Sequence, residues 1–346
     1  MDDGRAQGAA AGLAAALLFG VSTPVAKLLL PQSGPFLVAG LLYLGSGVGL
    51  IALEPFRARH REAPLARAEA IPLLGVVTAG GMVAPVLLMV GLGRLPGASA
   101  SLLLNLEAPF TIALAVVAFG ESLEAAEVAG ATAVVIGAAA LTVQGTLSGV
   151  HVVGALCVAG ACLAWALDNN LSQRLSVRDP VALTRLKSLV AGTANVGLAY
   201  AMGERLSRGT TLAGALATGF LGYGVSIVLH LRAMRRLGAA RQAALFATAP
   251  FAGALAAVPL LEERLSPRAL LAAIVMALGV VLMVRARHSH QHEHAPLRHE
   301  HAHEHDEHHQ HTHEEQVLGR HSHLHEHAAL THEHPHLPDA HHRHRH

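Results

Sequence analysis

The sequence predicts an all-α integral membrane protein with ten transmembrane helices, arranged as two inverted-topology repeats of five helices. Three observations lead to this fold class: the composition, a series of apolar segments, and an internal repeat. Of the 346 residues, 52% are hydrophobic and only 14% are charged, which is too apolar for an ordinary soluble domain. The formal net charge of +1 gives no reason to expect a nucleic acid as a partner, so the lipid bilayer is the expected environment.

Apolar segments recur from about residue 8 to residue 285. A hydrocarbon core about 30 Å thick needs roughly 20 apolar residues in a helix. Spans are predicted at 8–30, 35–54, 70–93, 97–119, 125–143, 150–172, 181–202, 211–234, 239–261 and 268–285. The first follows Arg5, as a signal peptide would, but nine further apolar segments come after it rather than a secreted domain. We therefore interpret it as a span.

The basic residues between the spans predict the orientation, because cytoplasmic connections carry an excess of Lys and Arg. With the N-terminus inside, thirteen arginines lie on the cytoplasmic side: Arg5, Arg57, Arg59, Arg61, Arg67, Arg174, Arg178, Arg232, Arg235, Arg236, Arg241, Arg285 and Arg287. The other side holds five: Arg94, Arg205, Arg208, Arg264 and Arg268. This asymmetry predicts that both termini are cytoplasmic.

The internal repeat appears when the second half is shifted over the first by 141 residues. The segment 98–121 then aligns with 239–262, and ten of the 24 positions match, including an Ala-Pro-Phe block at 108–110 and 249–251. Five spans separate equivalent positions, and because five is odd, the halves run through the membrane in opposite directions. Secondary transporters have this inverted architecture and bind substrate near the midplane between the halves. The repeat therefore favours a transporter.

Three motifs carry a family resemblance: LLFGVSTPVAKLL (17–29), LLLNLEAPFTIALAVVAFGESL (102–123) and LAWALDNNLSQRLS (163–176). Together with the ten-span layout, they resemble the EamA-type transporters of the drug/metabolite transporter superfamily over residues 8–285. The resemblance implies a secondary carrier for small molecules, often an exporter, in the inner (plasma) membrane. The substrates of the superfamily are too diverse for one to be transferred. The predicted divisions are two EamA-like five-helix repeats, 1–146 and 147–286, and a tail, 287–346.

Glu107 is the strongest candidate for a pathway residue. It lies about ten residues into the fourth span, with Asn105 two residues before it and Pro109 two residues after. An ionisable group at this depth costs at least about 2.5–3.5 kcal/mol on insertion scales, so it usually faces a polar interior. Such a carboxyl suits a proton-coupled carrier, although a structural, hydrogen-bonded role is the alternative.

A second group of candidates follows in the sixth and seventh spans. Asp168 and Lys187 are nearly equidistant from the connection between these spans, so we expect them to pair in an antiparallel hairpin beside Asn169. The pair is either a gate or a static brace. Lys27, near the outer end of the first span, either attracts an anionic group or extends its amine to the interface. His230 is interpreted as an interfacial side chain.

Signatures of enzymes are absent from the sequence. There is no GxxxxGK[ST] loop, no HExxH and no Gly-x-Ser-x-Gly elbow, so we expect no catalytic activity and no required cofactor. The two cysteines, Cys157 and Cys162, lie five residues apart in an apolar run and are interpreted as core residues.

The tail is compositionally different from the rest of the chain. It holds 23 of the 26 histidines, in runs such as HEHDEHHQHTHEE (303–315), and shows no apolar periodicity, so we expect disorder. Imidazole and carboxylate groups are ligands for Zn²⁺, Ni²⁺, Co²⁺ and Cu²⁺. The candidate ligands are His301, His303, His305, His308, His309, His311, His313, His323, His325 and His327. A charge switch as the pH falls toward 6, or a solvated extension without a specific role, are the alternatives.

Two functions remain open at this point. The first is a secondary transporter, expected to be an exporter, for a small molecule or a metal ion, with a cytoplasmic metal-binding tail. The second is a membrane-anchored metal buffer or chaperone whose helices serve mainly as an anchor. A homodimer is compatible with either, since the sequence does not define the oligomeric state.

Overall fold

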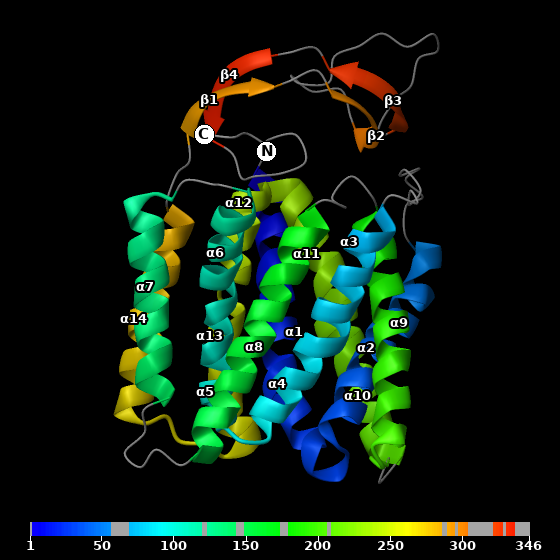
Figure 1. The fold of residues 1–346 in the computed structure, drawn as a ribbon, viewed down its shortest axis with the longest axis vertical. Coiled ribbons are helices and arrows are strands. Elements are labelled where there is room, and N and C mark those ends of the chain that lie inside the picture. The colour runs from blue at the N-terminus through cyan, green and yellow to red at the C-terminus, as the bar shows by residue number, and fades with distance from the viewer. Residues whose placement is uncertain are drawn as a thin grey trace.

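The computed structural model describes residues 2–56, 69–119, 123–142, 149–173, 179–205, 209–285, 289–294, 297–303, 321–327 and 330–335. In this part of the chain, long helices lie side by side in a bundle, and four short strands follow them in sequence (Figure 1).

The described residues form ten helical segments, at the positions that the hydropathy predicts. They are α1 (Asp2–Leu29); α2 (Pro35–Leu53); α3 (Ala70–Gly75), η4 (Val76–Val83) and α4 (Ala84–Leu92); α5 (Gly97–Leu103), η5 (Leu104–Leu106) and α6 (Glu107–Phe119); α7 (Ala125–Thr142); α8 (Gly149–Gln173); α9 (Pro180–Ala201); α10 (Gly209–Gly219), η6 (Phe220–Val225) and α11 (Ser226–Leu237); α12 (Ala239–Phe246) and α13 (Ala249–Leu261); and α14 (Pro267–Arg285). Short turns, η1 (Leu30–Gln32) and η2 (Glu54–Phe56), follow α1 and α2.

Nine of these segments, within the described residues, are long and apolar enough to cross a membrane. The exception is α9, whose 22 residues include Arg185 and Lys187 and which is therefore less apolar. It nevertheless lies alongside α2 over much of its length. A polar span of this kind depends on partners inside the bundle.

Successive segments alternate in direction along the bundle (Figure 1). We call the end at which α1 begins and α14 ends the upper end, following the view of Figure 1. The opposite, lower end carries the connections 30–34, 93–96 and 262–266. An even number of crossings places the start of α1 and the end of α14 on the same side.

Four segments are interrupted, and the interruptions form two matching pairs. The third and eighth segments each contain a wide π-helical stretch, η4 and η6. The regular α-helix of the fourth and ninth is interrupted just before an Ala-Pro-Phe block, by the 3-10 turn η5 and by the turn formed by residues 247–248. Proline lacks an N–H and restricts the residue before it, so a regular helix is weakened at this point in both segments.

Small residues allow the helices to approach closely, because the chain is poor in aromatic side chains. A Cβ atom added at Gly130 on α7 would lie 2.5 Å from the carbonyl oxygen of Gly279 on α14, and the reverse distance is 2.6 Å. Gly40 on α2 and Gly192 on α9 face each other in the same way, each 3.0 Å from the carbonyl oxygen of the other. Such contacts are typical of helix association in membranes.

The described residues of the tail, for which the sequence predicts disorder, form four strands. Strand β1 (Ser289–His294) pairs antiparallel with β4 (Leu330–Pro335), and β2 (Leu297–His303) pairs antiparallel with β3 (His321–His327). The register sets His301 opposite His323 and His303 opposite His321. Alternation of histidine with other residues has a period of two, which is the period of a strand.

Candidate functional site

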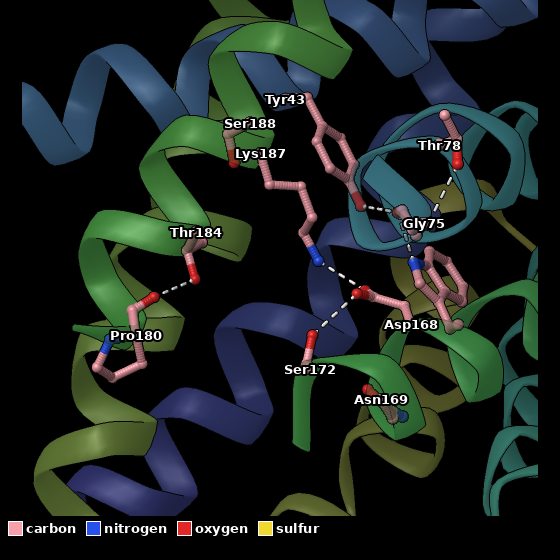
Figure 2. A network of polar contacts seen from close by, with 12 residues as sticks. Tyr43, Gly75, Thr78, Asp168, Asn169, Ser172, Pro180, Thr184, Lys187 and Ser188 are labelled. Atoms are coloured by element: carbon pink, nitrogen blue, oxygen red, sulfur yellow. Dashed lines mark hydrogen bonds and ion pairs between the residues drawn. The ribbon is translucent and has the colours of Figure 1, made fainter. Parts of the chain in front are cut away.

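An ion pair between α8 and α9 forms the centre of the candidate site (Figure 2). The Lys187 Nζ atom lies 2.6 Å from Asp168 Oδ2, and the two side chains are only 19% and 6% exposed. Ser172, one turn along α8, donates a hydrogen bond of 3.1 Å to the other oxygen of Asp168. The structure therefore brings together the two charges for which the hairpin argument predicts a contact.

Two consecutive glycines in η4 make room for this ion pair. A Cβ atom at Gly80 would overlap the carboxylate of Asp168, and one at Gly81 would lie 3.2 Å from the Cγ atom of Lys187. Any larger residue at position 80 would displace the carboxylate. The ion pair is thus seated against the third segment, and it joins that segment to the hairpin of α8 and α9.

The carbonyl oxygen of Gly80 is held by side chains instead of by the helix. The N–H of Ala84 donates to Ala79, and Pro85, the next residue, has no N–H to donate. Two ring donors take over: the hydroxyl of Tyr43 at 2.6 Å and the indole N–H of Trp165 at 3.1 Å. Both rings are nearly buried, at 5% and 8% exposure. They fix the η4 backbone that supports the ion pair.

Glu107 joins the same centre from the first turn of α6. Its Oε1 atom accepts a hydrogen bond of 2.8 Å from the side-chain amide of Asn169. Its backbone carbonyl accepts one of 2.8 Å from Thr111. The carboxyl therefore has a neutral amide as its side-chain partner, whereas the neighbouring Asp168 has an ammonium group. Of these two carboxyls, that of Asp168 is neutralised by a cation.

The amide of Asn169 faces the interior of the bundle. Leu156, Leu163 and Leu167 of α8 are 67%, 47% and 42% exposed and recur at helical spacing, so they mark the lipid-facing side of this helix. Asn169 follows Leu167 by two residues, which is a rotation of about 200° around the axis. Its side chain is nonetheless exposed, and Glu107 is partly exposed. These two polar groups therefore keep accessible surface on the side of α8 opposite its exposed leucines.

Two of the six predicted pathway residues lie outside this centre. Asn105 is buried and donates its amide hydrogen to the carbonyl of Leu102, a bond within its own segment. Lys27 lies at the lower end, where its amine donates to the carbonyl oxygens of Leu92 and Leu95. The structure brings together the other four: Glu107, Asp168, Asn169 and Lys187.

Sequence reasoning missed the residues that support the ion pair, namely Tyr43, Gly80, Gly81 and Trp165. One local signal points to them: Pro85 follows Gly80 by five residues and leaves a carbonyl without a helical donor. Which side chains would fill that role depends on long-range packing, since Tyr43 and Trp165 lie 37 and 85 residues away in sequence.

The ninth segment has a different set of groups near its interruption. Gln242 of α12 is fully buried, and its Nε2 atom lies 3.1 Å from Nδ1 of His230 on α11. The ring of Phe246 contacts that of His230 edge to face, with centroids 4.9 Å apart. Thr248 is exposed and donates to the carbonyl of Leu245. His230 is thus partly exposed and packs against Gln242 and Phe246, and these described side chains form no ion pair.

A row of aromatic rings connects the two regions. Tyr43 contacts Tyr223 at a centroid distance of 5.7 Å, Tyr223 contacts Phe19 at 5.6 Å, and Phe19 contacts Phe246 at 5.3 Å. Only 3% of the residues of the chain are aromatic, so four aromatic residues in one row are a large share of them. The row packs α1, α2, η6 and α12 against one another in the middle of the bundle.

Among the described side chains, no group of three or more His, Cys, Asp or Glu residues is placed to hold a metal ion. Of the predicted tail ligands, His305, His308, His309, His311 and His313 lie outside the described residues. The backbone positions of His301 and His303 are in β2, and those of His323, His325 and His327 are in β3. The two cysteines are free; Cys162 is buried in the core, as predicted, whereas Cys157, for which the same was predicted, is only partly buried.

Comparisons with known proteins agree with this architecture. The model of the EamA-like transporter family matches the chain twice, at residues 6–143 and 152–285. A protein described as an uncharacterized transporter, from Methanothermobacter thermautotrophicus (strain Delta H), is 29% identical over 288 residues, which cover 78% of this chain and 84% of that protein. A solved crystal structure, titled only as that of a protein, has a TM-score of 0.57 at 19% identity and covers 80% of this chain and 94% of its own, which shows a shared fold. The chain therefore belongs to the EamA-like transporter family and is a multi-pass membrane transporter.

Proposed function

We propose that this chain is a secondary active transporter, an exporter of a small solute, in which Glu107 lies on the solute pathway. The observation that carries the proposal is the contact between Glu107 and Asn169 on the interior side of α8. Glu107 comes from the first family-matched stretch, and Asn169 comes from the second. A site shared by the two halves can change its access when one half rocks against the other.

An inverted repeat of two five-helix halves is part of this proposal. It is supported by the two family matches and by the matching interruptions, η4 with η6 and η5 with the turn at 247–248. The 141-residue shift that aligns the Ala-Pro-Phe blocks also aligns Glu107 with Thr248. The halves are therefore similar in backbone and different in the side chain at this point.

Coupling to protons is assigned to Glu107. A carboxyl inside a membrane protein is costly when it is charged and lacks a cationic partner. The side-chain partner of Glu107 is the neutral amide of Asn169. Binding a proton removes that cost, and release of the proton to the other side of the membrane provides the driving force for the solute.

Asp168 and Lys187, which belong to the same centre as Glu107, are proposed to form a gate on the upper side of the site. The pair lies close to the upper ends of α8 and α9, and the arginine distribution favours a cytoplasmic upper end, with both termini in the cytoplasm of a plasma-membrane protein. Replacing Lys187 with Met stops transport but leaves a folded protein if the pair is a gate, and it removes the folded protein if the pair is a brace.

The histidine tail is proposed to bind Zn²⁺, Ni²⁺, Co²⁺ or Cu²⁺ and to regulate or buffer rather than to define the solute. The alternation of His with Glu and the cross-strand position of His301 and His323 favour several exchangeable sites. The same observation supports the second candidate function, a membrane-anchored metal buffer or chaperone.

One experiment separates these functions. Total cellular Ni, Co, Zn and Cu are measured by mass spectrometry during metal challenge in cells expressing the full chain, the Glu107→Gln variant or a chain that ends at Arg287. If a metal is the solute, its content changes with the full chain and returns to baseline in Glu107→Gln. If metal content follows only the tail, the tail is a metal sink and the solute is a metabolite. Loss of every activity with the tail supports the anchored buffer.

A further inference from the structure

A carboxylate from the second family-matched stretch is bound to the first stretch at the lower end. Glu263, in the connection between α13 and α14, accepts hydrogen bonds from the backbone N–H groups of Gly97 and Ala98 at 2.6 and 2.9 Å. These two residues begin the fourth segment, which carries Glu107 in its middle. The contact thus joins the ninth and tenth segments to the one that holds the proposed site.

Lys27 of α1 binds the 93–96 connection, which leads from α4 into α5. Its amine donates to the carbonyl oxygen of Leu92 at 2.8 Å and also to that of Leu95. Cations are favourable beside the carbonyl end of a helix, and carboxylates beside the N–H end. Gly97 lies between the two charges: a Cβ atom there would be 3.3 Å from Lys27 Cδ and 3.4 Å from Glu263 Oε1. Lys27 therefore holds the 93–96 connection, and Glu263 holds the start of α5 that follows it.

The backbone of Glu262 turns the chain so that Glu263 can make this contact. Glu262 has φ 54° and ψ 30°, and it is the one non-glycine residue with a positive φ in the described part of the chain. A left-handed conformation is uncommon outside glycine and ends α13 abruptly. The next residue then points its carboxylate at the start of α5.

The bundle is closed at the lower end and separated at the upper end along the fourth and ninth segments. Below their interruptions, α5 packs along α13. Above them, packing of this extent is not found between α6 and α12 among the described residues, and α6 packs against α8 instead. Glu107 and the exposed amide of Asn169 lie at the level where the segments part. The proposed site is therefore shut from below.

We propose that Lys27 and Glu263 are gate residues: their contacts with the 93–96 connection and with the start of α5 close the lower entrance to the Glu107 site, and opening that entrance requires their release. This inference rests on the proposed function. The repeat supports it, because Asp168, assigned to the upper gate, follows Lys27 by the same 141 residues that align the Ala-Pro-Phe blocks. One residue of each gate, Lys27 and Asp168, then occupies an equivalent position in the two halves, at opposite ends of the bundle.

The test measures access to the site and needs no knowledge of the solute. In a Cys157→Ala/Cys162→Ala background, Asn169→Cys is introduced as a reporter, and a membrane-impermeant maleimide is added from one side at a time, to intact cells or to inverted vesicles. Release of a charge-assisted hydrogen bond shifts an equilibrium by about tenfold or more. We therefore expect Lys27→Met and Glu263→Gln each to raise labelling from the lower side about tenfold, while labelling from the upper side falls or stays constant.

Glu204→Gln is the matched control. The carboxylate of Glu204 also accepts backbone hydrogen bonds at the lower end, from Phe36 and Leu37, but it binds α2, which packs along both α9 and α10. It should leave labelling of the reporter unchanged. The proposal is overturned if Lys27→Met and Glu263→Gln label at the parental rate, or if Glu204→Gln raises labelling equally.

A cross-link supplies a second measurement if a charge variant fails to fold. Gly97 and Leu261 are in contact across the lower entrance, so the Gly97→Cys/Leu261→Cys pair should form a disulfide that holds it closed. Oxidised protein should then lose labelling from the lower side and recover it after reduction. Labelling that is identical before and after reduction contradicts the gate. Both measurements can succeed even if solute transport itself is never found, so failure of the gate is distinguishable from failure of the proposed function.

Discussion

The fourth and ninth segments share a backbone plan and differ in their chemistry. Each is interrupted directly before an Ala-Pro-Phe block, at η5 and at the turn 247–248. Glu107 follows the first interruption and belongs to a centre with an ion pair, whereas Thr248 occupies the second beside a neutral pair of His230 and Gln242. The interruption is thus a property of the backbone in both halves, while the ionisable site belongs to one.

The largest difference in transport activity is expected between variants of Glu107 and variants of Thr248. We expect Glu107→Gln to lower proton-coupled transport about 100-fold or more, because the amide cannot exchange a proton. Thr248→Val keeps the shape of the side chain and loses only an exposed bond to Leu245, so more than half of the activity should remain. The measurement is solute-driven proton movement in proteoliposomes. Equal losses of transport in the two variants would mean that both positions contribute equally to transport.

The next largest difference, in the free energy of unfolding, is expected between variants of the Asp168–Lys187 ion pair and variants of the Gln242–His230 hydrogen bond. Lys187→Met leaves Asp168 as an unpaired buried charge, which should lower the free energy of unfolding by about 3–5 kcal/mol. Gln242→Leu removes a single neutral hydrogen bond to His230, so a loss of about 1 kcal/mol is expected. Denaturation in detergent gives both values. The Asp168→Asn/Lys187→Met double variant is the control: it should recover stability, and its failure to do so would assign the loss to packing.

The two π-helical stretches offer a comparison of intermediate size. Gly80→Ala places a methyl group on the Asp168 carboxylate and should cost about 1–3 kcal/mol of stability together with most of the transport activity. Gly224→Ala, in η6, meets its nearest neighbour at 3.4 Å, an ordinary contact, and should change stability by less than about 1 kcal/mol. Thermal unfolding of the two variants decides whether η4 is specifically adapted to the ion pair; similar shifts would show that it is not.

The smallest effect is expected for Ser101, which the 141-residue shift aligns with Gln242 of the second half. Its hydroxyl is buried, and no hydrogen-bond partner for it is found in the described part of the chain. Removing an unsatisfied polar atom should be neutral or slightly stabilising. We therefore expect Ser101→Ala to raise the unfolding temperature by a degree or two at most, by roughly the shift that a few tenths of a kcal/mol produces. A clear decrease would reveal a partner for the hydroxyl in another conformation.

The extent to which the sequence predicts the structure depends on the range of the interactions. Hydropathy predicts the ten segments, because the length of a span is set by the bilayer. The pairing of Asp168 with Lys187 follows from their equal distance to one hairpin connection, which is a local argument. The position of Glu107 near the middle of its segment follows in the same way.

The remaining parts of the site depend on contacts between distant segments. Tyr43 and Trp165 donate to the carbonyl of Gly80 only because η4 is π-helical and leaves this carbonyl without a backbone donor. Pro85 is the one local sign in the sequence that such a donor is missing. The sequence predicts that Lys27 either attracts an anion or extends toward the interface, whereas in the structure its amine binds carbonyl oxygens 65 and 68 residues away. No periodicity in the sequence encodes such partners, since they are set by the way the two halves pack.

The composition of α9 has a consequence for the biosynthesis of the protein. This helix carries Arg185 and Lys187 close to its start, and basic residues inside a span oppose its insertion, at a cost that decreases from the centre of a helix toward its end, so α9 is a poor substrate for the translocon by itself. Asp168 precedes Lys187 by only 19 residues and can neutralise it as soon as both have emerged from the ribosome. We expect α8 to wait beside the translocation channel until α9 is complete and then to enter the lipid with it as a hairpin. The ion pair at the candidate site would thus be assembled before the rest of the second half has been synthesised.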